Sequence, residues 1–299
     1  RYIEIAPSAP HALHMPSHIF TRVGAWQDSV TSNLRSASVA KAAGDCEDQL
    51  HAMDYLAYAY LQLANDSAVK RVVAEAPDVQ KSATPGLGEA YARAAIPARY
   101  AIERGAWQEA AQLQPQPTRF AFIKAFTHYA RALGAARGGD AAASESDVQE
   151  LARIVDMLKA AKNAYWATEV EVQRLGASAW IVFARGNREA AIDLMRTAAD
   201  LEDTSEKHAV SPGRLVPARE LLGDMLLESG KPAEALAQYE RSQVRDPNRF
   251  RTLYGAGQAA AQSGQRDKAK QYFTKLLEMT GVGELRPELQ NARRYLAGD

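Results

Sequence analysis

The sequence is poor in the features that would assign it to several large classes of protein. It has one cysteine, Cys46, which excludes a disulfide within the chain and a cysteine-rich zinc site. Lys and Arg number 36, as do Asp and Glu, so a net charge of +0 gives no electrostatic signature of nucleic-acid or anionic-membrane binding. No run of about 18 apolar residues occurs, so no membrane span is predicted. With 46% hydrophobic residues, the chain is expected to be soluble and globular.

Motifs of known catalytic chemistry are also missing. The sequence contains no His-Glu-x-x-His, no Gly-rich phosphate loop, no serine nucleophile elbow and no Cys/His pair. This favours a protein that is not an enzyme, although a metal-dependent enzyme without an established motif stays open.

What the sequence does contain is helical periodicity over almost its whole length. Apolar residues recur at i, i+3, i+4 and i+7 in windows rich in Ala, Leu, Glu and Arg, which predicts an all-α fold. Short breaks carry a Gly or Asn that ends one helix before the next begins. These breaks are Gly24-Ala-Trp, Leu63-Ala-Asn-Asp66, Gly105-Ala-Trp, Arg185-Gly-Asn, Ser229-Gly-Lys-Pro and Ser263-Gly-Gln-Arg. At the start, Arg1 to Ala6 is predicted to be the last turn of a helix that Pro7 ends.

Two of the breaks reveal an internal repeat, because Gly230 and Gly264 are 34 residues apart. When the two units are aligned with this offset, Leu222-Gly223, Gly230, Ala235 and Tyr239 of the first correspond to Ala256-Gly257, Gly264, Ala269 and Phe273 of the second. Small residues let the two helices of a hairpin approach, and the aromatic residue fills the remaining gap. The pattern resembles the tetratricopeptide repeat.

This resemblance implies an α-solenoid of roughly seven helical hairpins in one domain, 1–299. Looser repeats would cover 8–205, a well-matched pair 216–281, and a C-terminal capping helix 286–297. Several stretches also resemble a poorly characterised bacterial family of such proteins: His14-Met-Pro-Ser-His18, His51-Ala-Met-Asp-Tyr55 and Pro217-Ala-Arg-Glu220. A member would have further repeats before Arg1 and would be a soluble protein of the bacterial cytoplasm or periplasm.

A polar stripe is the main candidate for function. His11, His14 and His18 are spaced i, i+3 and i+7, which places them on one face of one helix, and Arg22 continues that face. Pro16 interrupts the stretch, and if the helix instead begins at Pro16, His11 and His14 lie in a loop. By the resemblance, the concave groove of the array is lined by His11, His14, His18, Arg22, His51, Asp54, Tyr58, Arg99 and Glu220.

Three hypotheses follow from this stripe. The first is a binding or scaffold protein whose groove, lined by His, Arg and Tyr, holds a peptide segment or a small acidic ligand. The second is a metal-binding protein or metal-dependent enzyme that holds a divalent transition metal (zinc, iron or copper). Its ligands would come from His14, His18, His51, Asp54 and His208. The third is a purely architectural module that joins other subunits. The oligomeric state stays open.

Overall fold

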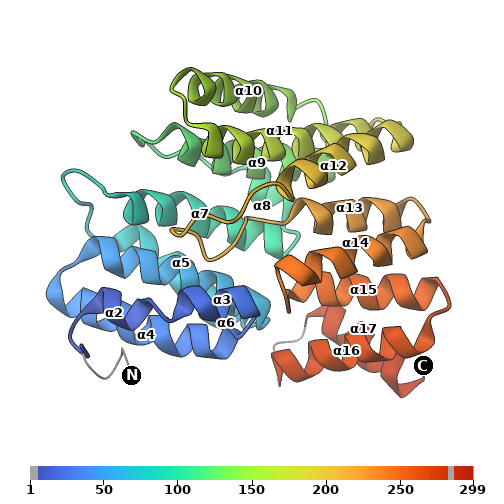
Figure 1. Cartoon of the computed structure of the whole chain (residues 1–299), viewed down its shortest axis with the longest axis horizontal. Coiled ribbons are helices and arrows are strands. Elements are labelled where there is room, and N and C mark those ends of the chain that lie inside the picture. The colour runs from blue at the N-terminus through green and yellow to red at the C-terminus, as the bar shows by residue number, and fades with distance from the viewer. Residues whose placement is uncertain (1–5, 282–285, 299) are drawn as a thin grey trace. The chain divides into compact units, whose positions relative to one another are not determined.

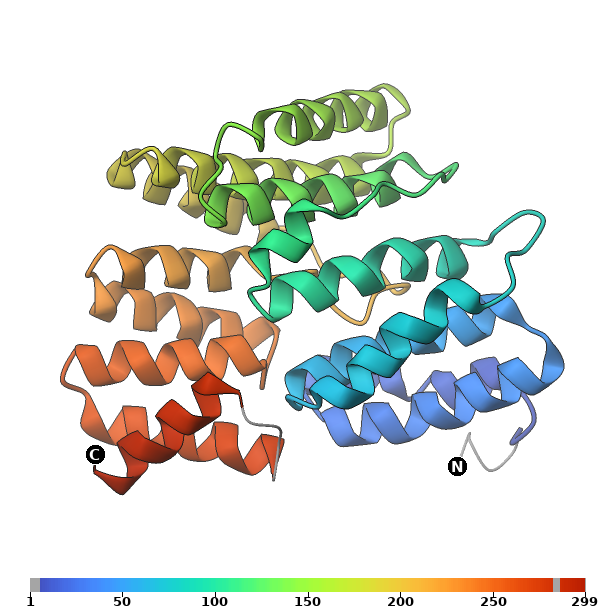
Figure 2. The same cartoon turned by 180° about the vertical axis from the view of Figure 1, so that it is seen from behind.

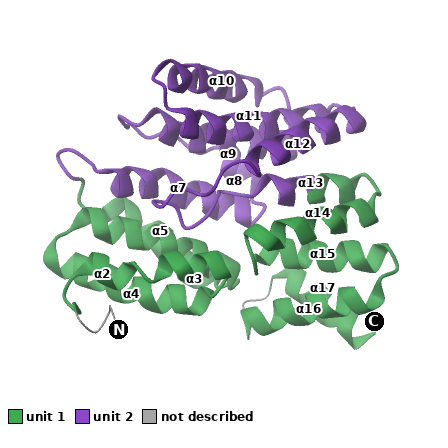
Figure 3. Cartoon of the chain, viewed as in Figure 1, with its two compact units in different colours: residues 1–81, 223–299 green, residues 82–222 purple. Residues whose placement is uncertain are grey.

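The computed structural model describes residues 6–281 and 286–298, and within these ranges the chain contains helices and no strand. The helical turn predicted over 1–6 lies outside the described residues except for Ala6, which is not helical. The chain divides into two compact units, Arg1–Lys81 with Gly223–Asp299, and Ser82–Leu222 (Figure 3). In the described part of the chain, no helix is long and apolar enough to cross a membrane.

The first unit is built from the two ends of the chain (Figure 1). Its first segment contains α2 (Pro10–His14), α3 (Ser17–Val23), α4 (Trp26–Ala43), α5 (Cys46–Gln62), α6 (Asp66–Glu75) and the short 3-10 helix η1 (Ala76–Asp78). Its second contains α14 (Pro232–Arg245), α15 (Phe250–Gln262), α16 (Arg266–Thr280) and α17 (Pro287–Ala297). Figure 2 shows α17, in red, lying across α15 and α16.

The second unit is the middle of the chain. It contains α7 (Leu87–Glu103), α8 (Trp107–Ala111), α9 (Ala121–Arg137), α10 (Glu145–Ala160), α11 (Ala164–Ala184) and α12 (Arg188–Glu202). A long loop follows, and the division between the units falls inside α13 (Ala218–Glu228). Within each unit, consecutive helices pack in neighbouring pairs, which confirms the predicted all-α solenoid class.

The predicted breaks coincide with helix ends, for the predicted reason. Gly24 ends α3 at a predicted break, in the left-handed conformation with φ of +68°. Gly44 is not among the predicted breaks, and it ends α4 in the same conformation with φ of +69°. Asn65 and Asn187 begin α6 and α12, and each side chain accepts a hydrogen bond from the backbone N–H three residues later. The chain turns sharply at these points because the local residues satisfy the backbone groups that a helix end leaves unpaired.

The repeat pattern is confirmed in the packing of its glycines. A Cβ built on Gly223 would lie 2.6 Å from the ring of Tyr239, and one on Gly257 would lie 2.5 Å from the ring of Phe273. Each aromatic ring therefore occupies the space that a side chain on its partner glycine would need. This close contact of small residue and ring is what the 34-residue register predicts.

Trp26, at the start of α4, joins the two segments of the first unit. Its ring is buried, and its indole Nε1 donates to the carbonyl of Asn248 at 2.6 Å. A second bond across the same contact runs from Arg249 Nη1 to the hydroxyl of Tyr58 at 2.7 Å. The N-terminal helices are thus held to the C-terminal repeats by hydrogen bonds from side chains as well as by packing.

Pro16 divides the histidine stretch into two helices, so the prediction of a single helix is wrong, and so is the alternative of a loop. His11 and His14 lie in α2, and His18 lies in α3. Met15 and Pro16 keep helical angles, but Pro16 has no N–H to continue the ladder. Beside the break, the carbonyl of Leu13 accepts a hydrogen bond from Ser32 Oγ of α4 at 2.6 Å. The kinked backbone is therefore tied to α4. In α7, by contrast, the helix continues through Pro97.

Candidate metal centre

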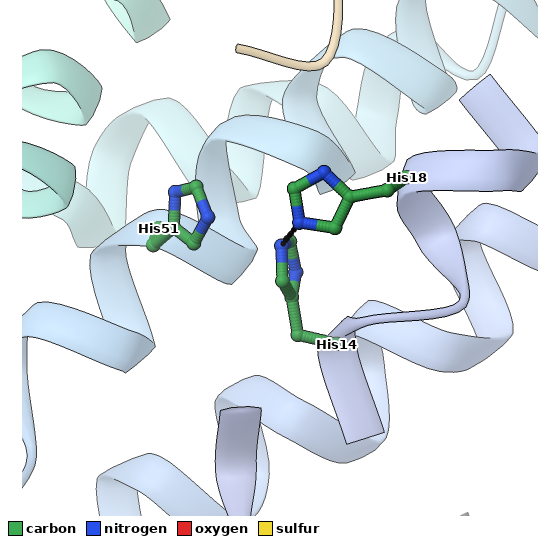
Figure 4. A group of neighbouring side chains, drawn as sticks. All are labelled: His14, His18 and His51. Atoms are coloured by element: carbon green, nitrogen blue, oxygen red, sulfur yellow. Dashed lines mark hydrogen bonds between the residues drawn. The ribbon is translucent and has the colours of Figure 1, made fainter. Parts of the chain in front are cut away.

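Three histidines from three helices of the first unit come together beside the Pro16 break. His14 is the last residue of α2, His18 lies in the first turn of α3, and His51 lies on α5. One ring nitrogen from each lies within 4.8 Å of the other two. Figure 4 shows His51 beside the hydrogen-bonded pair of His14 and His18. The sequence predicts that His14 and His18 share a face and names His51 among the candidate ligands, and the fold places His51 beside the other two.

His14 is the buried member of this histidine cluster. Its Nδ1 lies 2.6 Å from Asn33 Oδ1. The amide of Asn33 is oriented by its own bond, because Asn33 Nδ2 donates to the carbonyl of Ser29 at 2.7 Å. Since Asn33 therefore presents an acceptor, the proton of a neutral His14 ring must be on Nδ1. This leaves the lone pair of His14 Nε2 directed at the other histidines.

A chain of hydrogen bonds continues from His14 to Tyr55. His14 Nε2 lies 3.0 Å from His18 Nε2, and His18 Nδ1 lies 3.0 Å from the hydroxyl of Tyr55. The lone pair on His14 requires that His18 Nε2 donates and that His18 Nδ1 accepts from Tyr55. The order of donation is then Tyr55 to His18 to His14 to Asn33, and each ring has a defined tautomer.

Burial and neighbouring imidazoles keep His14 neutral. The pKa of His14 is lowered from 6.5 to about 2, chiefly by burial and next by the positive charge that His51 would carry. The hydrogen bond to Asn33 acts in the opposite direction, while His18 and His11 add smaller decreases. His14 Nε2 consequently stays unprotonated at any physiological pH.

Tyr55 closes the inner side of the histidine cluster. Its buried ring lies 4.5 Å, centroid to centroid, from His14 and 5.3 Å from both His18 and His51. His18 and His51 are only partly buried. The cluster therefore has an aromatic floor toward the core and two partly exposed rings toward the surface.

The other predicted residues of the first unit do not belong to the histidine cluster. His11 lies at the rim, with its side chain 63% exposed and its Nδ1 3.7 Å from an oxygen of Asp48. Arg22 is exposed on α3. Asp54 and Tyr58 are both buried on α5. Among the described residues, the group with metal-ligand spacing contains the three histidines and not Asp54.

The remaining predicted residues belong to the second unit. Arg99 is buried in α7, and its guanidinium donates to the carbonyls of Gly213 and Arg214, both at 2.8 Å. It thus fixes the long loop before α13. His208 lies in that loop with its ring 5.0 Å from the ring of Trp166. Glu220 is buried in α13.

Sequence reasoning missed the two residues that orient the histidines, Asn33 and Tyr55. A signal for Asn33 was present, because α4 carries Ser29, Ser32, Asn33 and Ser36 at i, i+3, i+4 and i+7. All four are buried, and such a stripe of small polar residues predicts a polar partner facing it. Tyr55 has a weaker signal, since it lies one turn after His51 on α5.

Comparisons with known proteins identify the repeat at the C-terminal end. A family model for the tetratricopeptide repeat matches residues 250–281, which comprise α15 and α16. No curated protein matches the sequence. Among solved structures, the chain is similar to the tetratricopeptide repeat domain of P58(IPK), at 15% sequence identity and a TM-score of 0.34. That match covers 99% of this chain and 81% of the other. The resemblance to a bacterial family stays a prediction.

Proposed function

We propose that this chain, a tetratricopeptide repeat protein with a matched repeat at 250–281, binds one divalent transition metal ion through His14, His18 and His51. Tetratricopeptide folds are in general protein-interaction modules, so the metal would be held within a binding or scaffold protein. One observation carries the metal assignment: three imidazole nitrogens from three helices converge to within 4.8 Å.

The spacing of the nitrogens fits a shared ion. Two imidazoles that bind one tetrahedral zinc ion at about 2.05 Å have nitrogens roughly 3.3 Å apart. The Nε2 atoms of His14 and His18 are 3.0 Å apart, so a small outward movement would admit an ion between them. His51 is partly exposed and can complete the group by a side-chain rotation.

The protonation of the rings also supports metal binding. A metal ligand must be a neutral imidazole, and the pKa of His14, lowered to about 2 by burial, keeps that ring neutral. His18 would carry its proton on Nδ1 instead of Nε2, and this N–H could donate a hydrogen bond to the hydroxyl oxygen of Tyr55. Each ring would then bind the ion through one nitrogen and donate the N–H of its other nitrogen to a fixed acceptor, as metal-bound histidines usually do. For His14 that acceptor is Asn33.

The donor set favours some ions over others. Imidazole suits zinc, copper, iron and nickel, whereas magnesium and calcium require oxygen ligands. Within the described chain, no carboxylate joins the three histidines. Zinc is therefore the first ion to test.

The test is a stoichiometry measurement on protein without a histidine tag. Wild-type protein loaded with zinc and then dialysed should retain about one equivalent by elemental analysis, set by the single three-histidine group. The His51→Gln variant, which changes a partly exposed residue, should lose the ion and keep its helical circular-dichroism spectrum.

A matched control is His128→Gln, which removes a histidine that pairs with Asp147 in the second unit. This variant should retain zinc. Absence of zinc from the wild-type protein, or its full retention in His51→Gln, would refute the proposal.

The peptide and architectural hypotheses stay predictions. Of the predicted groove residues, His11 and Arg22 are exposed, whereas Tyr58 and Arg99 are buried. Tyr58 accepts a hydrogen bond from Arg249, and Arg99 donates one to the carbonyl of Gly213. A peptide carboxylate would therefore meet Arg22 first. Loss of a co-purified peptide on Arg22→Ala supports the peptide hypothesis, and an oligomer that this change does not affect supports the architectural one.

A further inference from the structure

We infer that the metal ion held by His14, His18 and His51 keeps one coordination position open for a ligand from outside the protein, either water or a small monodentate anion. This inference rests on the proposed metal site and specifies what that site binds. Three features of the histidine cluster support it: the number of ligands, the charge around the ion, and the exposure of the rings.

The first feature is the ligand count. Zinc sites that serve a structural role have four protein ligands, whereas sites that exchange a ligand have three. In the described ranges, no fourth histidine, cysteine, aspartate or glutamate lies within the spacing that the three histidines share. A four-coordinate ion would thus take its last ligand from solution.

The second feature is the charge. Three neutral imidazoles leave the full charge of a divalent ion uncompensated, because the cluster supplies no carboxylate. The side chain of Asp48, the acidic group at the rim, lies 3.7 Å from His11 Nδ1. An anion at the open position would balance the charge that the protein ligands do not.

The third feature is access. The buried His14 and the ring of Tyr55 close the inner side, so the open position must lie on the side where His18 and His51 are partly exposed. A small ligand can reach that side without unfolding a helix. A bulky ligand would meet the exposed ring of His11, whose centroid lies 6.1 Å from that of His14.

His11 is the alternative occupant of the fourth position. Its side chain is 63% exposed and could turn toward the ion, which would close the site with four histidines. The two arrangements, a fourth position open to solvent and a fourth position filled by His11, predict different anion binding when His11→Gln is compared with the wild-type protein. If the position is open, the variant binds small anions as the wild-type protein does. If His11 fills it, only the variant binds them.

The experiment uses cobalt(II) as a spectroscopic substitute for zinc and azide as the anion. Cobalt-loaded wild-type protein should show visible absorption bands that shift saturably as azide is added, and His11→Gln should show the same shift. A protein that takes up no cobalt overturns the metal site itself. A protein with one equivalent of cobalt whose bands azide leaves unchanged overturns only the open position. An azide shift found in His11→Gln but absent from the wild-type protein also overturns it, and assigns His11 as the fourth ligand.

Discussion

Replacing His14 should remove a large part of the acid sensitivity of the metal-free protein. Burial lowers the pKa of His14 from 6.5 to about 2, so the folded protein does not bind the proton that the unfolded chain takes up as the pH falls below 6.5. The contribution of His14 to the free energy of unfolding is therefore largest above about pH 7.5, and it decreases as the pH falls below that value. Stability falls with falling pH because the folded protein holds His14 in its neutral form.

The magnitude follows from the same shift. For each pH unit below 6.5, the free energy of unfolding decreases by about 1.4 kcal/mol, until the pH reaches the pKa of His14 in the folded protein. Between pH 8 and pH 5 the loss from His14 is thus about 2 kcal/mol. In His14→Gln the side chain cannot titrate, yet its amide can still donate to Asn33. The free energy of unfolding of this variant should fall by about 2 kcal/mol less than that of the wild-type protein over the same range.

The assay is urea unfolding at pH 8 and pH 5, followed by circular dichroism, with a chelator present so that bound metal does not stabilise the folded state. His11→Gln is the matched control, because it removes an exposed imidazole from the same helix, and it should show the wild-type difference. If His14→Gln loses as much stability as the wild-type protein between pH 8 and pH 5, burial does not keep His14 neutral. The argument that its Nε2 is unprotonated and able to bind a metal would then be refuted.

Three further predictions concern the packing and the orientation of the site. Gly24→Ala and Gly44→Ala both place a side chain at positive φ, at a cost of about 1–2 kcal/mol each. Only Gly24→Ala places its added Cβ 2.5 Å from the carbonyl oxygen of Pro247. Thermal unfolding should therefore show a free energy of unfolding lower by a further ~1–3 kcal/mol for Gly24→Ala than for Gly44→Ala. Equal decreases in the two variants would contradict the contact with Pro247. Tyr55→Phe should keep the zinc stoichiometry but weaken affinity at least about 10-fold in a chelator competition, because one histidine loses its fixed partner; unchanged affinity would remove Tyr55 from the site. Arg99→Met should speed proteolysis of the loop 203–217, because two carbonyls lose a charged donor, at a cost of about 2–4 kcal/mol; a wild-type cleavage rate would show that the loop is held by other contacts.

The open coordination position gives the proposed metal site a role within a repeat protein. An ion with four protein ligands would contribute to folding alone, whereas one with an exchangeable ligand can also bind a molecule from solution. A carboxylate on a peptide partner is itself a small anionic ligand at its point of contact. The metal and peptide hypotheses are therefore compatible, and the azide experiment bears on both.

Much of the fold could be predicted from the sequence because it depends on neighbours along the chain. Helix ends at Gly24 and Asn65 follow from local capping, and the spacing of Gly257 and Phe273 follows from the repeat period. The approach of His14 and His18 has the same origin, since residues four apart share a face even across the Pro16 kink.

What only the tertiary structure decided is which faces meet and which side chains they bury. His51 approaches His14 because α5 packs beside the N-terminal helices, and Asn33 fixes the ring of His14 because α4 turns its polar stripe toward α2. The prediction that Arg99 lines the groove did not indicate that Arg99 would be buried beneath a loop more than a hundred residues later. Periodicity determines the face on which a residue lies, but the element opposite that face is chosen by packing between distant parts of the chain.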